Sequence, residues 1–226
     1  MFDIVWQSDQ VLVIDKHAGV NFHSEQGEAG LFATLTQSFP SLYPVHRLDK
    51  PTSGLLVMAK TADANRQLCE QFRQRQVDKY YLAISGKKPR KKQGSVVGDM
   101  TSARRGAWML TRTRHNPART AFVSCHMAPG LRLFVVKPAT GRTHQIRVAL
   151  KSVGAPIVGD TLYGAEPSDR LYLHAYSLGF EINGEYQRFT QPPSSGALFG
   201  DTAFTHLMSG DVIDVAEPWN MAWPAC

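Results

Sequence analysis

Cysteine is scarce in this sequence, and its usage excludes two common ways of stabilising a small fold. The three cysteines, Cys69, Cys125 and Cys226, are odd in number, lie far apart and do not form a C-x-x-C pair. This pattern argues against a disulfide framework and against a structural zinc site. It is typical of a protein that works in a reducing compartment, so we expect a cytoplasmic location.

Long hydrophobic runs are also missing from the chain. No window approaches the roughly 20 apolar residues that a membrane-spanning helix needs, and we expect no membrane association. The first ten residues, MFDIVWQSDQ, lack the basic and apolar regions of a signal peptide. What remains is a chain of 226 residues, 43% of them hydrophobic, which suffices for the core of one large or two small domains.

Acidic residues are nearly absent from the middle of the chain. Residues 87–147 contain 14 Lys and Arg but one acid, Asp99, which gives this segment a net charge of +13. The rest of the chain sums to −7. Because a solvated surface usually mixes both signs, this segregation predicts a face that binds a polyanion. Nucleic acid is favoured over a membrane because no amphipathic basic helix accompanies the charge.

Short strands with a few intervening helices predict an α+β protein with many antiparallel strands. We expect strands at both sides of a polar turn within 4–20, strands at 55–60, 78–86 and 171–182, a hairpin within 107–137 that turns at Pro129 and Gly130, and helices at 30–38, 61–74 and 141–154. Thr61 is expected to cap the second helix and Thr143 the third. Residues 87–94 are expected to form a basic loop, and residues 193–226 an irregular C-terminal extension.

The segment HRLDKPTSGLLVMAK, residues 46–60, places Asp49 on a turn in front of a buried strand. By itself, an aspartate before Pro-Thr-Ser-Gly is more often a turn residue than a catalytic one. A kinase catalytic loop is excluded because Leu48 separates Arg47 from Asp49, and because no Asp-Phe-Gly and no glycine-rich phosphate loop are present. Ser53 lacks the G-x-S-x-G context of a serine nucleophile.

Five separate stretches of the chain resemble the RluA-type RNA pseudouridine synthases. HRLDKPTSGLLVMAK, VDKYYLAISG, ATGRTHQIRVAL, VGDTLYG and LHAYSLGF occur in this order with spacings similar to those of the family, and the resemblance covers about residues 4–192. It implies the α+β pseudouridine synthase catalytic fold, with a mixed, mainly antiparallel, bent sheet, flanking helices and a central RNA-binding cleft. Residues 1–226 would then form a single catalytic domain without the N-terminal RNA-binding domain that many members carry.

The resemblance implies an isomerase that converts uridine in ribosomal RNA or tRNA to pseudouridine after flipping the base out of its stack. It assigns Asp49 as the catalytic aspartate, Arg147 as its buried ion-pair partner, and Tyr81 as the tyrosine that stacks on the uracil. A carboxylate in a dry pocket needs such a cation, because loss of water disfavours its charge. Ile146 resembles the floor of the pocket, and Arg47 the wedge that takes the place of the flipped base.

Tyr80 lies on the opposite strand face from Tyr81, so only one of the two can face the pocket.

Further residues are assigned to RNA binding. Substrate binding is also assigned to residues of the two main motifs, namely His46, Arg142, Thr143 and His144. Contacts with the RNA backbone are assigned to nine basic residues: Lys87, Lys88, Arg90, Lys91, Lys92, Arg104, Arg105, Arg112 and Arg114. We therefore expect RNA binding to weaken steeply with salt.

No cofactor and no metal are expected, because the family reaction oxidises nothing and adds no outside atom to the base. His46, His144 and His174 lack the tight spacing of a zinc helix and are interpreted as hydrogen-bonding groups. The expected partner is an RNA stem-loop, bound by a monomer. The alternative function is a non-catalytic RNA-binding module or RNA chaperone. A structural interaction protein that uses the proline-containing, acidic tail has only composition in its favour.

Overall fold

The computed structural model describes residues 1–25, 27, 29–210 and 214–226. The chain forms two compact units, which we call unit 1 (Met1–Lys79 and His174–Pro193) and unit 2 (Tyr80–Leu173 and Ser194–Cys226). Within the described part of the chain, none of the helices has the length and apolar character that crossing a membrane requires.

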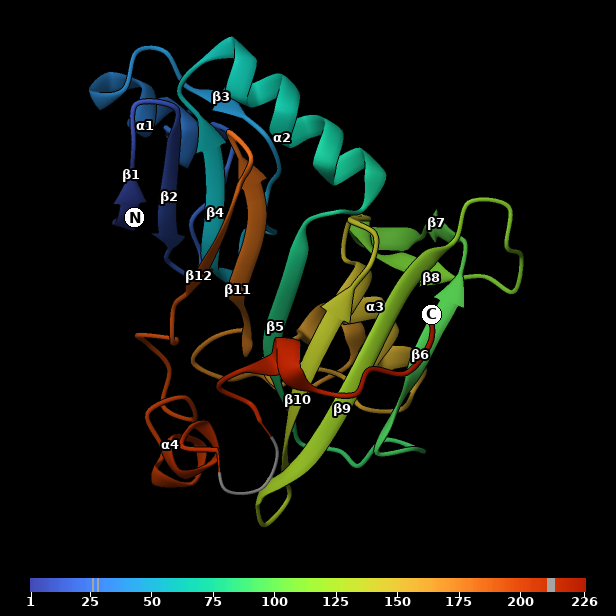
Figure 1. Cartoon of the computed structure of the whole chain (residues 1–226). Helices are drawn as coiled ribbons and strands as arrows, with labels where there is room; N and C mark the ends of the chain where they lie inside the picture. Colours follow the sequence, from blue (N-terminus) through green and yellow to red (C-terminus); the bar gives the residue numbers. More distant parts are fainter. Residues whose placement is uncertain (26, 28, 211–213) are drawn as a thin grey trace. The chain divides into compact units, whose positions relative to one another are not determined.

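Unit 1 is built on a mixed sheet. Its strands are β1 (Phe2–Gln7), β2 (Val11–Lys16), β3 (Tyr43–Pro44), β4 (Ser53–Ala59), β11 (Leu173–Ile182, whose first residue belongs to unit 2) and β12 (Glu185–Thr190). They lie in the order β1-β2-β4-β11-β12, with β3 paired to β4 (Figure 1). The β4–β11 pair is parallel, whereas β1–β2, β2–β4, β3–β4 and β11–β12 are antiparallel. Gly54 is required at the parallel pair, because its φ is +112° and a Cβ there would lie 2.3 Å from the Ala175 carbonyl oxygen.

The described residues of unit 1 include two helices, and both occur where the sequence predicts them. Helix α1 (Leu31–Ser38) buries Leu31 and Leu35. Helix α2 (Ala62–Gln74) packs on the unit 1 sheet (Figure 1), where Ala64 and Leu68 join a buried cluster with apolar residues of β2, β4 and β11. Thr61 caps α2 as predicted, because its hydroxyl accepts a hydrogen bond from the Ala64 amide at 3.2 Å.

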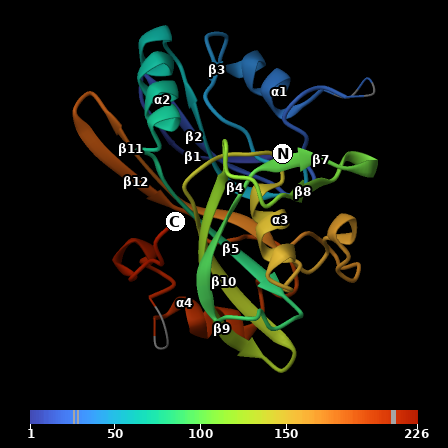
Figure 2. The same cartoon turned by 90° about the vertical axis from the view of Figure 1, so that its right-hand side faces the viewer.

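Unit 2 contains an antiparallel sheet and a separate hairpin. The strands are β5 (Asp78–Ser85, whose first two residues belong to unit 1), β6 (Gln93–Gly98), β7 (Met100–Ser102), β8 (Trp108–Leu110), β9 (Ala118–Ala128) and β10 (Leu131–Pro138). The sheet has the order β5-β10-β9-β6, and β7 pairs with β8. Figure 2 shows the long β9–β10 hairpin, which turns at Pro129 and Gly130 as predicted. The expected α+β class with mixed, mainly antiparallel strands is thus confirmed.

Helix α3 (Gln145–Ser152) begins four residues later than predicted. The prediction that Thr143 caps it is wrong: the N-cap residue is His144, which has φ +57° and makes no side-chain cap bond. The cause is the buried Gln145 side chain, whose oxygen accepts a hydrogen bond from the Thr140 hydroxyl at 2.7 Å and whose amide group donates to two oxygens of β9. These bonds hold the residues before α3 in a turn.

The C-terminal extension is less irregular than the sequence suggests. Helix α4 (Thr202–Met208) follows an N-cap aspartate, Asp201, whose carboxylate accepts from the Ala203 amide at 2.7 Å. Its residues Phe204 and Leu207 are buried. A short 3₁₀ turn (Pro218–Asn220) follows. Part of the predicted extension therefore contributes to the core of unit 2.

Candidate active site

Asp49 lies in unit 1 on a tight turn directly before β4. The turn is closed by a hydrogen bond of 3.0 Å from the Thr52 amide to the Asp49 carbonyl. Leu48 is buried, Asp49 is half-buried, and Arg47 is exposed. The turn therefore presents a carboxylate near the surface with an exposed guanidinium two residues before it.

A buried lysine fastens this turn to strand β2. Lys16, which is fully buried, donates hydrogen bonds from Nζ to the carbonyls of His17 at 3.0 Å, Val20 at 2.8 Å and Lys50 at 3.1 Å. Lys50 is the residue after Asp49, so the third bond fixes the backbone that carries the carboxylate. A buried ammonium with three carbonyl partners is fully used as a donor.

A buried serine–histidine pair holds the other end of the turn. Ser53 Oγ lies 2.8 Å from His174 Nδ1, and His174 Nε2 lies 2.7 Å from the Gln191 carbonyl oxygen. Because a carbonyl only accepts, Nε2 carries the proton and Nδ1 accepts the hydroxyl proton of Ser53. The Ser53 hydroxyl is therefore a structural donor that ties β4 to β11.

His46 is held by the fold of unit 1. Its Nε2 accepts a hydrogen bond from the Val57 amide at 3.1 Å, and its ring stacks on Phe72 with centroids 4.6 Å apart. Burial, and secondarily the charge of Lys79, lower the pKa of His46 from 6.5 to about 3. His46 is therefore neutral at physiological pH and supports the strand beside the Asp49 turn.

In unit 2, Tyr80 and Tyr81 occupy opposite faces of β5. Tyr80 is 2% exposed, its ring centroid lies 6.5 Å from that of Trp219 and 5.7 Å from that of Trp223, and Lys137 Nζ lies 5.2 Å from the same ring. Tyr81 keeps a partly exposed side chain. Tyr80 is thus part of the unit 2 core, and Tyr81 is the one of the two that solvent reaches.

The Arg147 guanidinium is held by a buried carboxylate that the sequence interpretation missed. Nε donates to Asp160 Oδ2 and Nη2 donates to Asp160 Oδ1, both at 2.8 Å, and the two side chains are 7% and 1% exposed. Such a bidentate pair fixes the plane of the guanidinium as well as its position. Asp160 is the acid of VGDTLYG, a stretch that the sequence singled out without giving its residues a role.

A tyrosine of the same stretch supports Arg147 from another side. The ring centroid of Tyr163 lies 5.0 Å from the Arg147 guanidinium carbon. The Tyr163 hydroxyl accepts a hydrogen bond from the Trp108 amide at 2.9 Å and lies 2.9 Å from His144 Nδ1. One motif, residues 158–164, thus positions Arg147, and it holds His144 through Tyr163.

The other predicted site residues fall into two groups. Ile146 is 7% exposed in the first turn of α3, and Arg142 and Thr143 line a cavity in unit 2. The nine residues assigned to the RNA backbone are all exposed and all belong to unit 2. Unit 2 therefore brings together Ile146 and Arg147 on α3 and His144 at its N-cap. The approach of Asp49 to Arg147 and Tyr81 stays a prediction.

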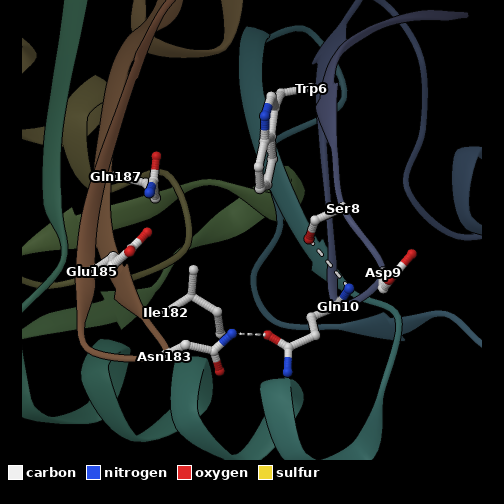
Figure 3. Close-up of a pocket in the computed structure, with 8 residues that line it drawn as sticks. All are labelled: Trp6, Ser8, Asp9, Gln10, Ile182, Asn183, Glu185 and Gln187. Atoms are coloured by element: carbon white, nitrogen blue, oxygen red, sulfur yellow. Dashed lines mark hydrogen bonds between the residues drawn. The ribbon is translucent and has the colours of Figure 1, made fainter.

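Unit 1 has a cavity of about 500 Å³ that none of the predicted site residues lines. Figure 3 shows Trp6 of β1 on one side, Glu185 and Gln187 of β12 on the other, and the hydrogen bond of 2.6 Å that joins Asn183 to Gln10. Its ionisable lining residues, Asp9 and Glu185, are both acidic and would repel RNA phosphates. Among the described residues, no group of three or more His, Cys, Asp or Glu side chains could hold a metal ion.

The chain is similar to several known proteins. The sequence model of a family described as RNA pseudouridylate synthase matches residues 10–152. An uncharacterised RNA pseudouridine synthase of Haemophilus influenzae is 46% identical over 201 residues, which cover 87% of this chain and 90% of that protein. The dual-specificity RNA pseudouridine synthase RluA of Escherichia coli is 33% identical over 187 residues, covering 77% and 84%. The solved structure of human RNA pseudouridylate synthase domain containing 1 is 27% identical with a TM-score of 0.71, covering 85% of this chain and 84% of that one.

Proposed function

The chain belongs to the RNA pseudouridylate synthase family, and we propose that it isomerises specific uridines of ribosomal RNA or tRNA to pseudouridine. The buried, bidentate Arg147–Asp160 pair carries this proposal. A guanidinium with a fixed plane in the protein interior is what an ionised catalytic carboxylate needs in a pocket without water. A protein that only binds RNA has no need for one, because phosphates are bound by exposed cations.

The reaction exchanges one bond to the ribose for another. The bond between uracil N1 and ribose C1′ breaks, the base rotates, and a bond between C5 and C1′ forms. C5 then loses its proton and N1 gains one, so the product is an isomer of the substrate. Asp49 acts on the ribose, by attack at C1′ or by removal of the 2′ proton, and both routes use the carboxylate in its charged form.

Arg147 keeps Asp49 charged and oriented in this proposal. A guanidinium has two edges that each donate a pair of hydrogen bonds, and Asp160 takes the Nε–Nη2 edge. The resemblance implies that the Asp49 carboxylate is the second partner of this guanidinium, and the proposal keeps that pairing. Lys16 and the Ser53–His174 pair support the proposal, because they fix both ends of the turn that carries Asp49.

The remaining roles follow the exposure of each side chain. Tyr81 stacks on the flipped uracil, and Arg47 enters the space that the base leaves, since both keep exposed surface. The nine exposed basic residues of unit 2 contact RNA phosphates. We further propose that both units act as one catalytic domain, and that the protein works in the cytoplasm as a monomer.

Tritium release from RNA labelled with [5-³H]uridine tests the activity, because the C5 proton is lost as pseudouridine forms. The substrate is RNA from cells that lack this protein. Wild type should release tritium, and Asp49→Asn, which keeps the size of the side chain and removes its charge, should release only background. Asp63→Asn, in an exposed ion pair on α2, is the matched control and should behave as wild type.

Two results would contradict the proposal. Equal release by wild type and Asp49→Asn would show that Asp49 is not the catalytic carboxylate. No release by the wild type, with RNA binding intact, would favour the alternative of an RNA-binding module. Mapping pseudouridines in RNA from cells with and without the protein then identifies the modified position.

A further inference from the structure

Unit 2 has a cavity of about 370 Å³ beside the turn that precedes α3. Its lining includes Asp99, Trp108, His115, Asn116, Arg142 and Thr143. The volume lies within the range of pockets that hold small organic ligands, roughly 300–1,000 Å³. None of these residues belongs to the group of Asp49, Tyr81 and Arg147, so the cavity needs an explanation of its own.

The lining of this cavity includes an aromatic residue, Trp108, on an anchored strand. Trp108 is the first residue of β8 and is partly exposed. Its amide donates a hydrogen bond of 2.9 Å to the Tyr163 hydroxyl, which anchors the strand. A partly exposed indole on a strand anchored in this way can serve as a stacking platform for a nucleobase, since every base offers a π-face.

The other lining residues of the cavity include a cation, Arg142, and several polar groups. Arg142 is exposed, and its guanidinium donates to the Asn116 side-chain oxygen. Asp99, the one acid among residues 87–147, accepts hydrogen bonds from the His115 amide at 2.9 Å and the Asn116 amide at 2.8 Å. The Asp99 carboxylate thus binds backbone amides, and Arg142 is the cation that a phosphate would contact.

We propose that this cavity binds a second, unpaired nucleotide of the RNA substrate, with its base on Trp108 and its phosphate at Arg142. This inference rests on the proposed function and adds a subsite to it. The exposed arginines before and after β8 (Arg104, Arg105, Arg112 and Arg114) would contact the neighbouring phosphates. Because Trp108 and Arg147 both contact Tyr163, binding at the subsite also places the RNA relative to Arg147, which positions Asp49.

A titration followed at the tryptophan indole N–H signals tests the subsite without any catalysis. The chain has four tryptophans, and replacing Trp108 by Phe assigns its signal. Three probes are compared: uridine 5′-monophosphate, ribose 5-phosphate and a single-stranded hexauridylate RNA. We expect the Trp108 signal to shift and saturate with the monophosphate, and to shift far less with ribose 5-phosphate, which has no base to stack.

Hexauridylate should bind at least about tenfold more tightly than the monophosphate, because adjacent phosphates reach the basic residues. Equal affinity would mean a site for free nucleotides and would overturn the RNA assignment. A Trp108 signal that does not move, or that moves equally with ribose 5-phosphate, would overturn the stacking itself. Arg142→Gln should weaken monophosphate binding, and unchanged binding would remove the phosphate contact.

Activity gives the second readout. Trp108→Ala should lower kcat/KM for tritium release by about five- to 150-fold, the range that loss of one stacked base implies, mainly through KM. Trp108→Phe should restore most of the loss. Met109→Ala, at an exposed neighbour on the other strand face, is the matched control and should match wild type. Equal kcat/KM for Trp108→Ala and wild type would overturn the subsite.

The two proposals fail in different ways. Asp49→Asn should abolish tritium release and leave the Trp108 titration unchanged. If tritium release persists while no nucleotide shifts the Trp108 signal, the proposed subsite is wrong and the proposed activity stands. If the Trp108 signal responds to RNA while the wild type releases no tritium, the proposed activity is wrong.

Discussion

The buried ion pair between Arg147 and Asp160 offers the sharpest test of how the site is built. The perturbation is Asp160→Asn, which keeps the shape of the side chain and removes its charge. The wild-type carboxylate accepts two hydrogen bonds of 2.8 Å from the guanidinium. An asparagine accepts only one of them, and its amide group turns a donor toward the other guanidinium donor.

The expected cost follows from the burial of both side chains, which are 7% and 1% exposed. Removing one partner of a buried ion pair typically costs about 3–5 kcal/mol, because the other charge stays in the interior. We expect a loss of this size in the free energy of unfolding, measured as a shift of the urea midpoint. Activity should fall at least about tenfold, because a misplacement of about 1 Å in a catalytic group can cost 100-fold.

Asp63→Asn is the control for this test, since it breaks an Asp–Arg pair of the same chemistry on the surface of α2. The Arg66 and Asp63 side chains are 77% and 56% exposed, so no measurable loss of stability is expected. A loss below about 1 kcal/mol for Asp160→Asn, or equal effects of the two variants, would refute the argument from burial.

Two further predictions concern pH and salt. The pKa of His46 is about 3 in the folded protein, against an ordinary value of 6.5. Between these two pH values the unfolded chain therefore binds more protons than the folded one. The free energy of unfolding falls as the pH drops through this window. When the pH is lowered from 7 to 4.5, the free energy of unfolding of the wild type, measured by urea unfolding, should fall by at most about 3 kcal/mol more than that of His46→Gln. Equal decreases in the two proteins would contradict the burial of the ring. Replacing four lysines by Gln (Lys87, Lys88, Lys91 and Lys92) should reduce the slope of log K for single-stranded RNA against log salt by up to about 3, and an unchanged slope would remove this loop from the binding face.

Local signals in the sequence predicted most of the elements correctly. The cap of α2 is a bond between Thr61 and Ala64, three residues apart, and the β9–β10 turn needs only Pro129 and Gly130. Two local signals were not used. Asn-Gly at 183–184, both at positive φ, makes the β11–β12 turn, and Asp201 before α4 is an ordinary cap.

What the sequence could not predict depends on long-range partners. Helix α3 begins at Gln145 because that side chain binds oxygens of β9, about 25 residues away. The motif VGDTLYG suggested a family, but nothing in its letters says that Asp160 binds Arg147. The resemblance pairs Arg147 with Asp49, and a second carboxylate becomes apparent only when α3 and the 158–164 segment are seen together.

The Arg147–Asp160 pair also separates stability from function. A buried ion pair is seldom needed for stability, because well-packed apolar residues of similar size often replace it at no cost or with a gain of about 1–4 kcal/mol. We therefore expect the urea midpoint of the double variant Arg147→Met with Asp160→Leu to be at least as high as that of Asp160→Asn, and close to that of the wild type. Tritium release should nevertheless be lost, because no guanidinium remains to hold the Asp49 carboxylate. A stable double variant that still releases tritium would show that Arg147 serves only the fold, and the ion pair proposed for Asp49 would have to be abandoned.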